Sequence, residues 1–164
     1  MHPHLNPPRA TQGSALSLKG RALRLLSARE HSRTELERKL APHAETPEQL
    51  AQVLDDLQAK DFISETRVVE SVINRRAARF GTARVRYELV AKGLGEELVM
   101  EAVQRLKATE LERAREVWRK KFAGKADDAA PDAAARLKQM RFLAARGFGT
   151  EVIRRVVAGA DTDD

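Results

Sequence analysis

Apolar residues recur at helical spacing along most of the chain. Between residues 47 and 60, for example, Leu50, Val53, Leu54 and Leu57 are spaced so that all four fall on one face of a helix. The same kind of spacing fits every other segment between residues 17 and 160. The pattern therefore predicts an all-α protein.

Residues that favour helix starts stand between these apolar segments. Ser32 and Glu35 have the spacing of a capping box, in which each side chain accepts a hydrogen bond from the other residue's backbone N–H. Pro47 stands at the first position of a helix, where its missing N–H costs nothing. The residues predicted to cap helix N-termini are Ser32, Thr46, Ser64, Thr82 and Thr109.

Glycine and proline mark the helix ends. A second glycine stands two residues after Gly93 and two residues after Gly147, a spacing that resembles the start of a dinucleotide-binding loop. Because a predicted helix precedes each of these glycine pairs, we interpret them as helix endings. Together with the caps, these signals predict nine helices, over approximately residues 18–29, 32–41, 46–60, 64–80, 82–92, 95–108, 109–123, 132–146 and 150–160.

The chain aligns with itself as three repeats. Leu40, Leu89 and Leu143 fall into register, as do the turn residues that follow them, at spacings of 49 and then 54 residues. The extra length lies in the segment 125–131. We therefore expect three tandem three-helix repeats in an elongated, curved, solenoid-like array. The predicted parts are a disordered leader at 1–16, repeats at 17–64, 65–108 and 109–160, and an acidic tail at 161–164.

Composition narrows the possible functions. The chain has no cysteine, which excludes disulfides, thiolate zinc sites and cysteine nucleophiles. No apolar run is long enough to span a bilayer, and the first residues lack the apolar middle of a secretory signal, so a cytoplasmic protein that does not contact a membrane is expected. A net charge of +6 favours a polyanionic partner, although by itself it shows only non-specific attraction.

Two groups of basic residues are the candidate binding surface. The alternative interpretation of each is a solvated helix face, but arginine predominates in the first group and suits two-pronged contact with phosphates or carboxylates. In the first group, between Ile73 and Gly93, Glu88 is the only acid. The residues proposed to contact an anionic partner, either a phosphate backbone or an acidic protein surface, are Arg75, Arg76, Arg79, Arg84, Arg86 and Lys92 in the first group and Arg113, Arg119, Lys120 and Lys121 in the second.

The sequence gives little evidence for base stacking, metal binding or catalysis. Trp118 either stacks a nucleic-acid base or packs in a core with Phe122, which lies at helical spacing from it. The four histidines are scattered, with no pair at metal-ligand spacing on one predicted helix, and the carboxylates fall at caps or among basic neighbours. We therefore expect no metal, no cofactor and no enzymatic activity.

Three sets of motifs follow one another along the chain. They are Ala22 to Leu40, then Gly81 with Arg84-Val85, Glu88-Leu89 and Lys92-Gly93-Leu94, and finally Phe142 to Val157. In this order they resemble the motifs of the RecX family. The segment from Asp61 to Glu65 departs from the family pattern, and Val68 and Val69 stand where an aromatic residue is usual, while the order of motifs is intact.

This resemblance implies a small non-enzymatic protein that binds the helical groove of a RecA filament on single-stranded DNA. Such a protein restrains strand exchange, ATP hydrolysis and coprotease activity, so a role in recombination, DNA repair and the SOS response is expected. A monomer with non-specific, salt-dependent DNA binding would fit this function. A helix-turn-helix regulator would instead be a dimer with a defined DNA site, and a protein-only helical adaptor would not bind DNA.

Overall fold

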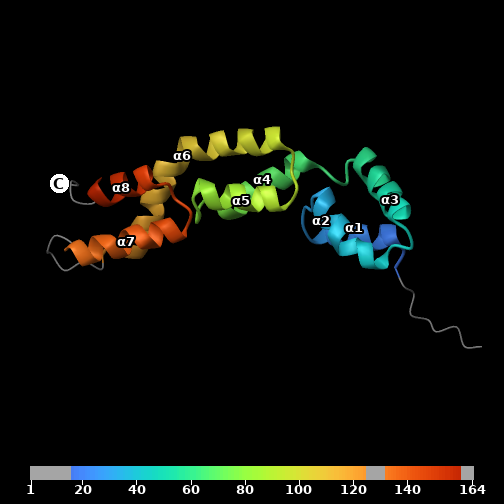
Figure 1. Cartoon of the computed structure of the whole chain (residues 1–164), viewed down its shortest axis with the longest axis horizontal. Coiled ribbons are helices and arrows are strands. Elements are labelled where there is room, and N and C mark those ends of the chain that lie inside the picture. The colour runs from blue at the N-terminus through green and yellow to red at the C-terminus, as the bar shows by residue number, and fades with distance from the viewer. Residues whose placement is uncertain (1–15, 125–131, 160–164) are drawn as a thin grey trace, which may run out of the picture.

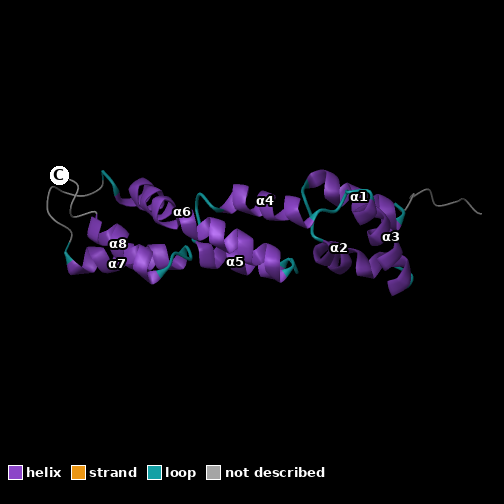
Figure 2. Ribbon diagram, turned by 90° about the horizontal axis from the view of Figure 1, so that it is seen from above, coloured by secondary structure: helices purple, strands orange, loops and turns teal. Residues whose placement is uncertain are grey.

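A computed structural model describes residues 16–124 and 132–159, and within them the chain folds into eight α-helices and one 3₁₀-helix. The helices form an elongated, gently bent row that is narrow in two perpendicular views (Figures 1 and 2). The elements are α1 (Leu18–Ala28), α2 (Arg33–Leu40), η1 (Ala41–His43), α3 (Pro47–Ala59), α4 (Glu65–Arg76), α5 (Thr82–Ala91), α6 (Glu96–Phe122), α7 (Ala133–Ala145) and α8 (Thr150–Gly159).

Three segments predicted from the sequence lie outside the described residues. They are the leader at 1–16, apart from Leu16, the insertion at 125–131 and the acidic tail at 161–164. Within the described part of the chain, no helix is long and apolar enough to cross a bilayer.

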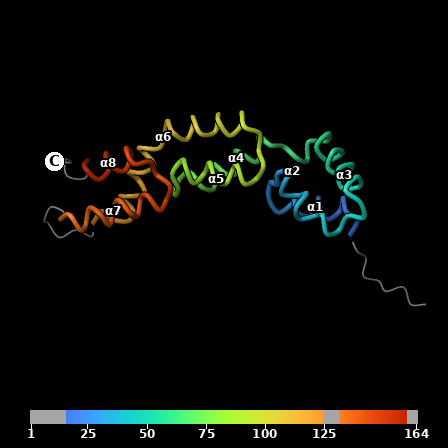
Figure 3. The backbone as a smooth tube through the Cα atoms, viewed as in Figure 1, coloured from blue at the N-terminus to red at the C-terminus, as the bar shows by residue number. Residues whose placement is uncertain are grey.

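Three hydrophobic clusters divide the row into units. Figure 3 traces the backbone through these units in chain order. The first is built by α1 to α3 around Leu36 and Leu54. The second joins α4 and α5 to the first half of α6 around Leu89, and the third joins the second half of α6 to α7 and α8 around Leu143. The predicted all-α array of three-helix units is confirmed.

One predicted helix boundary is wrong, because α6 is a single helix of 27 residues. Thr109 and Glu112 were expected to cap a new helix, but the Thr109 hydroxyl instead donates to the Leu106 carbonyl within α6. No glycine or proline interrupts residues 96–122, so the backbone bonds of the helix continue through this point. Eight α-helices therefore replace the nine expected ones in the described residues, and the second and third units share α6.

Most of the predicted N-terminal caps are confirmed. Ser32 and Glu35 form the complete capping box, and the side chains of Thr46 and Ser64 cap α3 and α4. Thr82 is a second exception, after Thr109: it is the first residue of α5 rather than its cap, and it is buried. Its N–H donates to the buried carboxylate of Glu110 on α6, 3.1 Å away, so a neighbouring helix supplies the missing cap.

Neighbouring units dock through the same contact twice. The Ser32 hydroxyl donates to the Lys92 carbonyl at 2.6 Å, and the Gly81 N–H donates to the Arg146 carbonyl at 2.8 Å. Ser32 and Gly81 stand 49 residues apart, and Lys92 and Arg146 stand 54 apart, which are the repeat spacings read from the sequence. In each junction, the end of one unit's second helix thus meets the start of the preceding unit's second helix.

The glycines at these junctions allow the close approach. Gly93 and Gly147 follow α5 and α7 with φ of 70° and 88°, in the left-handed region that favours glycine. A Cβ on Gly93 would lie 2.2 Å from the Thr34 hydroxyl oxygen, and one on Gly147 would lie 2.5 Å from the Arg84 Cβ. The predicted helix-ending role of both glycines is confirmed, and each turn also packs against the preceding unit.

Glu35 holds the first junction together electrostatically. Its carboxylate accepts hydrogen bonds from Arg29 at 2.6 Å, from Lys92 at 3.0 Å and from the Ser32 N–H at 3.2 Å. Burial by itself would raise the pKa of Glu35, but the bonds from Arg29 and Lys92 outweigh it and lower the pKa to about 2.

Replacing Glu35 with Gln should lower stability at neutral pH by about 2 kcal/mol, the scale of a lost charge-assisted hydrogen bond. The carboxylate stabilises the fold above the unfolded pKa near 4.5, and this contribution is lost as the pH falls toward 2. The difference between wild type and E35Q in denaturant unfolding should therefore shrink across that window. Exposed Glu45, changed to Gln, is the matched control; a difference that is unchanged from pH 7 to pH 3 would contradict the assignment.

Candidate nucleic-acid interface

Two of the predicted binding residues are held inside the chain. Arg113 is half-buried and donates to the carbonyls of Ala77, Phe80 and Leu106 at 2.6–2.9 Å. Burial also lowers the pKa of its guanidinium group. The Lys92 ammonium pairs with Glu35 and is only 12% exposed. Arg113 therefore ties α6 to the end of α4, and Lys92 ties the second unit to the first, so neither is free to contact a partner.

Two further predicted binding residues, Arg76 and Arg119, each lie beside a carboxylate. Arg76 Nε lies 3.2 Å from Glu88 Oε2, close enough for an ion pair but not aligned for a hydrogen bond. Arg119 pairs with Glu116 one turn away on α6 and stays exposed. These carboxylates offset much of the two positive charges, which weakens the prediction for both residues.

Arg75 and Arg86 are both exposed. Arg75 Nε donates to the Ser71 carbonyl at 3.3 Å. Arg86 lines a largely apolar groove of about 530 Å³ between α5 and α6, beside the exposed side chains of Val90 and Met100. Neither residue joins the cluster formed by the rest.

The remaining cations converge where the second unit meets the third. Arg79, Lys120 and Lys121 surround a cleft of about 250 Å³ together with Arg146, which follows α7. Phe142 and Val117 supply its apolar lining, and no carboxylate lines it. We call this site the cationic cleft. Four positive groups without an acidic partner in the lining are suited to an anion.

The Phe80 ring contacts two of the arginines that line the cationic cleft, Arg79 and Arg146. The guanidinium carbon of Arg84 lies 4.3 Å from the centre of its ring, and that of Arg146 lies 5.3 Å from it. Arg76 and Arg79 are also within 5.7 Å of the same ring. Each such contact contributes about 0.5–1 kcal/mol at an exposed site, without cancelling the charge. One neutral ring thus gathers arginines that repel one another.

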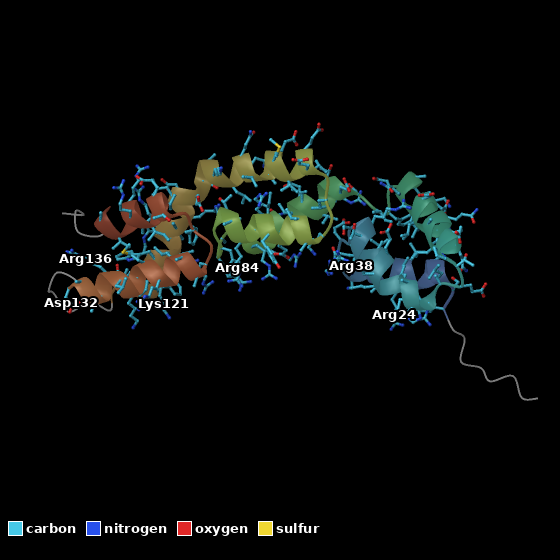
Figure 4. All side chains as sticks on the ribbon, viewed as in Figure 1. Arg24, Arg38, Arg84, Lys121, Asp132 and Arg136 are labelled. Carbon is cyan, nitrogen blue, oxygen red and sulfur yellow. The ribbon has the colours of Figure 1, made fainter. Side chains whose placement is uncertain are left out.

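The charges of the cleft lie on an accessible edge of the molecule. Figure 4 shows Arg84 of α5 and Lys121 of α6 along the same long edge of the row. The Lys121 ammonium lies 5.4 Å from the centre of the Phe142 ring, and Arg84 donates to the Ala145 carbonyl at 3.2 Å. Side chains from the second and third units therefore present one continuous basic surface.

Trp118 packs in the third core rather than offering a surface for a base. It is partly buried, its indole N–H donates to Gln139 at 2.9 Å, and its ring centre lies 6.3 Å from that of Phe122. Tyr87 on α5 is instead an exposed aromatic residue, with 76% of its surface accessible.

Arg146 lines the site although it was not among the predicted binding residues. Arg146 directly precedes Gly147, as Lys92 precedes Gly93, so the repeat alignment would have placed it at a junction. Among the described residues, no group of three or more histidines or carboxylates could hold a metal ion.

Known proteins resemble this chain in both sequence and fold. Models of the first and third three-helix domains of RecX match residues 19–57 and 108–157. The regulatory protein RecX of Leptothrix cholodnii is 53% identical, over 93% of this chain and 94% of its own length. That of Ralstonia pickettii is 49% identical, over 89% of each chain.

A crystal structure of RecX from Lactobacillus salivarius has the same fold. Its TM-score is 0.72 at 19% identity, and the match covers 88% of this chain and 94% of that one. The sequence relatives span nearly the whole chain, and the family models match its first and third three-helix units. This chain therefore belongs to the RecX family of regulatory proteins.

Proposed function

We propose that this protein binds a RecA filament on single-stranded DNA and restrains its activities, with the cationic cleft as the main contact. Family membership supports a regulatory role, and the cleft supports a phosphate-bearing partner. The observation that most strongly supports the proposal is a single cleft with no carboxylate in its lining, which contains Arg79, Lys120, Lys121 and Arg146.

The mechanism is physical occlusion rather than chemistry. Bound phosphates relieve the mutual repulsion of the clustered cations, which no internal acid does in the cleft lining. Arginine can hold two phosphate oxygens at once, and the lysines add point charges beside it. A narrow row of helices lying along the filament as a monomer would hinder the entry of duplex DNA and the exchange of RecA subunits.

A helix-turn-helix mode is less well supported. The turn at Gly93 would make α6 the recognition helix, with its first residues against DNA. Those residues are Glu96 and Glu97, whose negative charges would face phosphates and base edges unfavourably. A protein-only adaptor is distinguished by its lack of DNA binding.

The effect on RecA can be measured as single-stranded-DNA-dependent ATP turnover. Wild-type protein should lower the turnover. The triple variant Arg79→Ala, Lys120→Ala, Lys121→Ala should need at least about tenfold more protein, because one charge-assisted hydrogen bond is worth about 1.5 kcal/mol or more. The matched control removes three exposed arginines outside the cleft: Arg115, Arg154 and Arg155. Turnover that stays constant in excess wild-type protein would refute the proposal.

Binding to single-stranded DNA alone should depend steeply on salt. Each phosphate that is neutralised on a single strand contributes about −0.7 to the slope of log affinity against log salt concentration. The cleft triple variant should therefore have a slope smaller in magnitude by about 2, and the control triple variant should match wild type. Equal slopes for wild type and the cleft variant, measured by fluorescence anisotropy, would exclude the cleft as the DNA contact.

A further inference from the structure

The first unit contains a counterpart of the cationic cleft. A cavity of about 370 Å³ lies between α1 and α2, with Arg21, Arg24 and Lys39 on its walls and Leu25 and Leu40 in its lining. No carboxylate lines this cavity either. We call it the first-unit cleft.

The two clefts occupy the same place in the repeat. Lys39 and His43 of the first-unit cleft stand 103 residues before Phe142 and Arg146 of the cationic cleft. On the first helix of each unit, Arg24 stands 96 residues before Lys120. The difference of seven residues equals the length of the segment 125–131, which separates α6 from α7 in the chain.

The cations of the first-unit cleft keep their charge. The structure shows no carboxylate partner for Arg21 or Arg24 within the described residues. The Lys39 ammonium lies 3.2 Å from Nε2 of His31, a buried ring whose Nδ1 lies 3.0 Å from the Arg29 carbonyl. Burial lowers the pKa of His31, which favours the neutral ring; in the tautomer with its proton on Nδ1, Nε2 accepts from Lys39 and Nδ1–H donates to the Arg29 carbonyl.

His31 and Phe80 therefore do similar work in equivalent positions. The two residues stand 49 residues apart, and each directly precedes the residue at the start of its unit's second helix that docks the next unit. Each ring contacts cations without neutralising them. An acidic residue in either place would have cancelled the charge of the adjoining cleft.

The middle unit differs at the same positions. Where the first unit has Lys39, the second has Glu88, which pairs with Arg76. Where the first unit has His43, the second has Lys92, which pairs with Glu35 across the first junction. At these two positions the middle unit therefore has charges that pair with one another or with the first unit, whereas the cations of the two outer clefts have no carboxylate in their linings.

We propose that the first-unit cleft is a second binding site for the sugar-phosphate backbone of single-stranded nucleic acid, and that one strand engages both outer clefts across the middle unit. The choice of occupant rests on the proposed function, in which the chain contacts single-stranded DNA. Charge supports it independently, because both linings contain cations and apolar groups but no acid. Arg24 of the first-unit cleft and Lys121 of the cationic cleft lie along the same edge of the row in Figure 4.

Two attachment points predict a dependence on strand length. A short oligothymidylate, of about five nucleotides, can fill only one cleft, whereas a longer strand can fill both and gains the effective concentration of the second contact. Affinity should therefore rise by about 100-fold or more over a narrow range of lengths, in excess of the gradual rise expected for a single site.

The test compares two matched double variants over a ladder of strand lengths. Arg21→Ala with Arg24→Ala removes two cations from the first-unit cleft, and Lys120→Ala with Lys121→Ala removes two from the cationic cleft. Each pair should remove the step in affinity with length, while binding to the short strand falls by no more than several-fold. The control pair Arg154→Ala with Arg155→Ala should behave as wild type, and circular dichroism melting checks the fold of each variant.

The outcomes separate this inference from the proposed function. If Lys120→Ala with Lys121→Ala weakens binding while Arg21→Ala with Arg24→Ala retains the wild-type step, the first-unit cleft is not a site and the proposed function stands. Wild-type binding by both variants would overturn the inference and the role of the cationic cleft together. Loss of the step in both variants, with short-strand binding retained, is the expected result.

Discussion

The architecture depends on one contact made twice: the last carbonyl of a unit's second helix accepts a hydrogen bond from the start of the preceding unit's second helix. Ser32 donates to Lys92 in the first junction, and Gly81 donates to Arg146 in the second. Each unit has its own small core, so these junctions and the shared helix α6 fix the units in one row. Glycine follows both acceptor residues because a side chain there would collide with the preceding unit.

The two junctions share their geometry and differ in charge. Glu35 and Arg84 stand 49 residues apart, the repeat spacing, and the change from an acid to a base reverses the local field. Glu35 pairs with Arg29 and Lys92, so the first junction is closed by its own ions. Arg84 instead joins Arg146 over the Phe80 ring, so the second junction keeps its positive charge for an external anion.

Local signals in the sequence were enough for the helical class, for most caps and for the repeat. The capping box at Ser32 and Glu35 and the turn at Gly147 depend on neighbours a few residues away, and both are confirmed. Whether an individual cation is bonded inside the chain or exposed to solvent could not be predicted, because this depends on residues that are distant in the sequence. Lys92 meets Glu35, and Arg113 meets carbonyls more than 30 residues away. The uninterrupted helix α6 shows the same limit, since a threonine and a glutamate at capping distance also fit inside a helix.

The most direct measurement places a cross-linker in the cationic cleft. The chain has no cysteine, so Ala78→Cys in the cleft and Ala51→Cys on α3 can each carry a single photoreactive group. If the second junction holds the phosphate backbone, the probe at residue 78 will attach to DNA within a RecA filament, and the probe at residue 51 will do so far less. Equal attachment at both sites, or attachment from residue 51 alone, would contradict the placement of the binding surface.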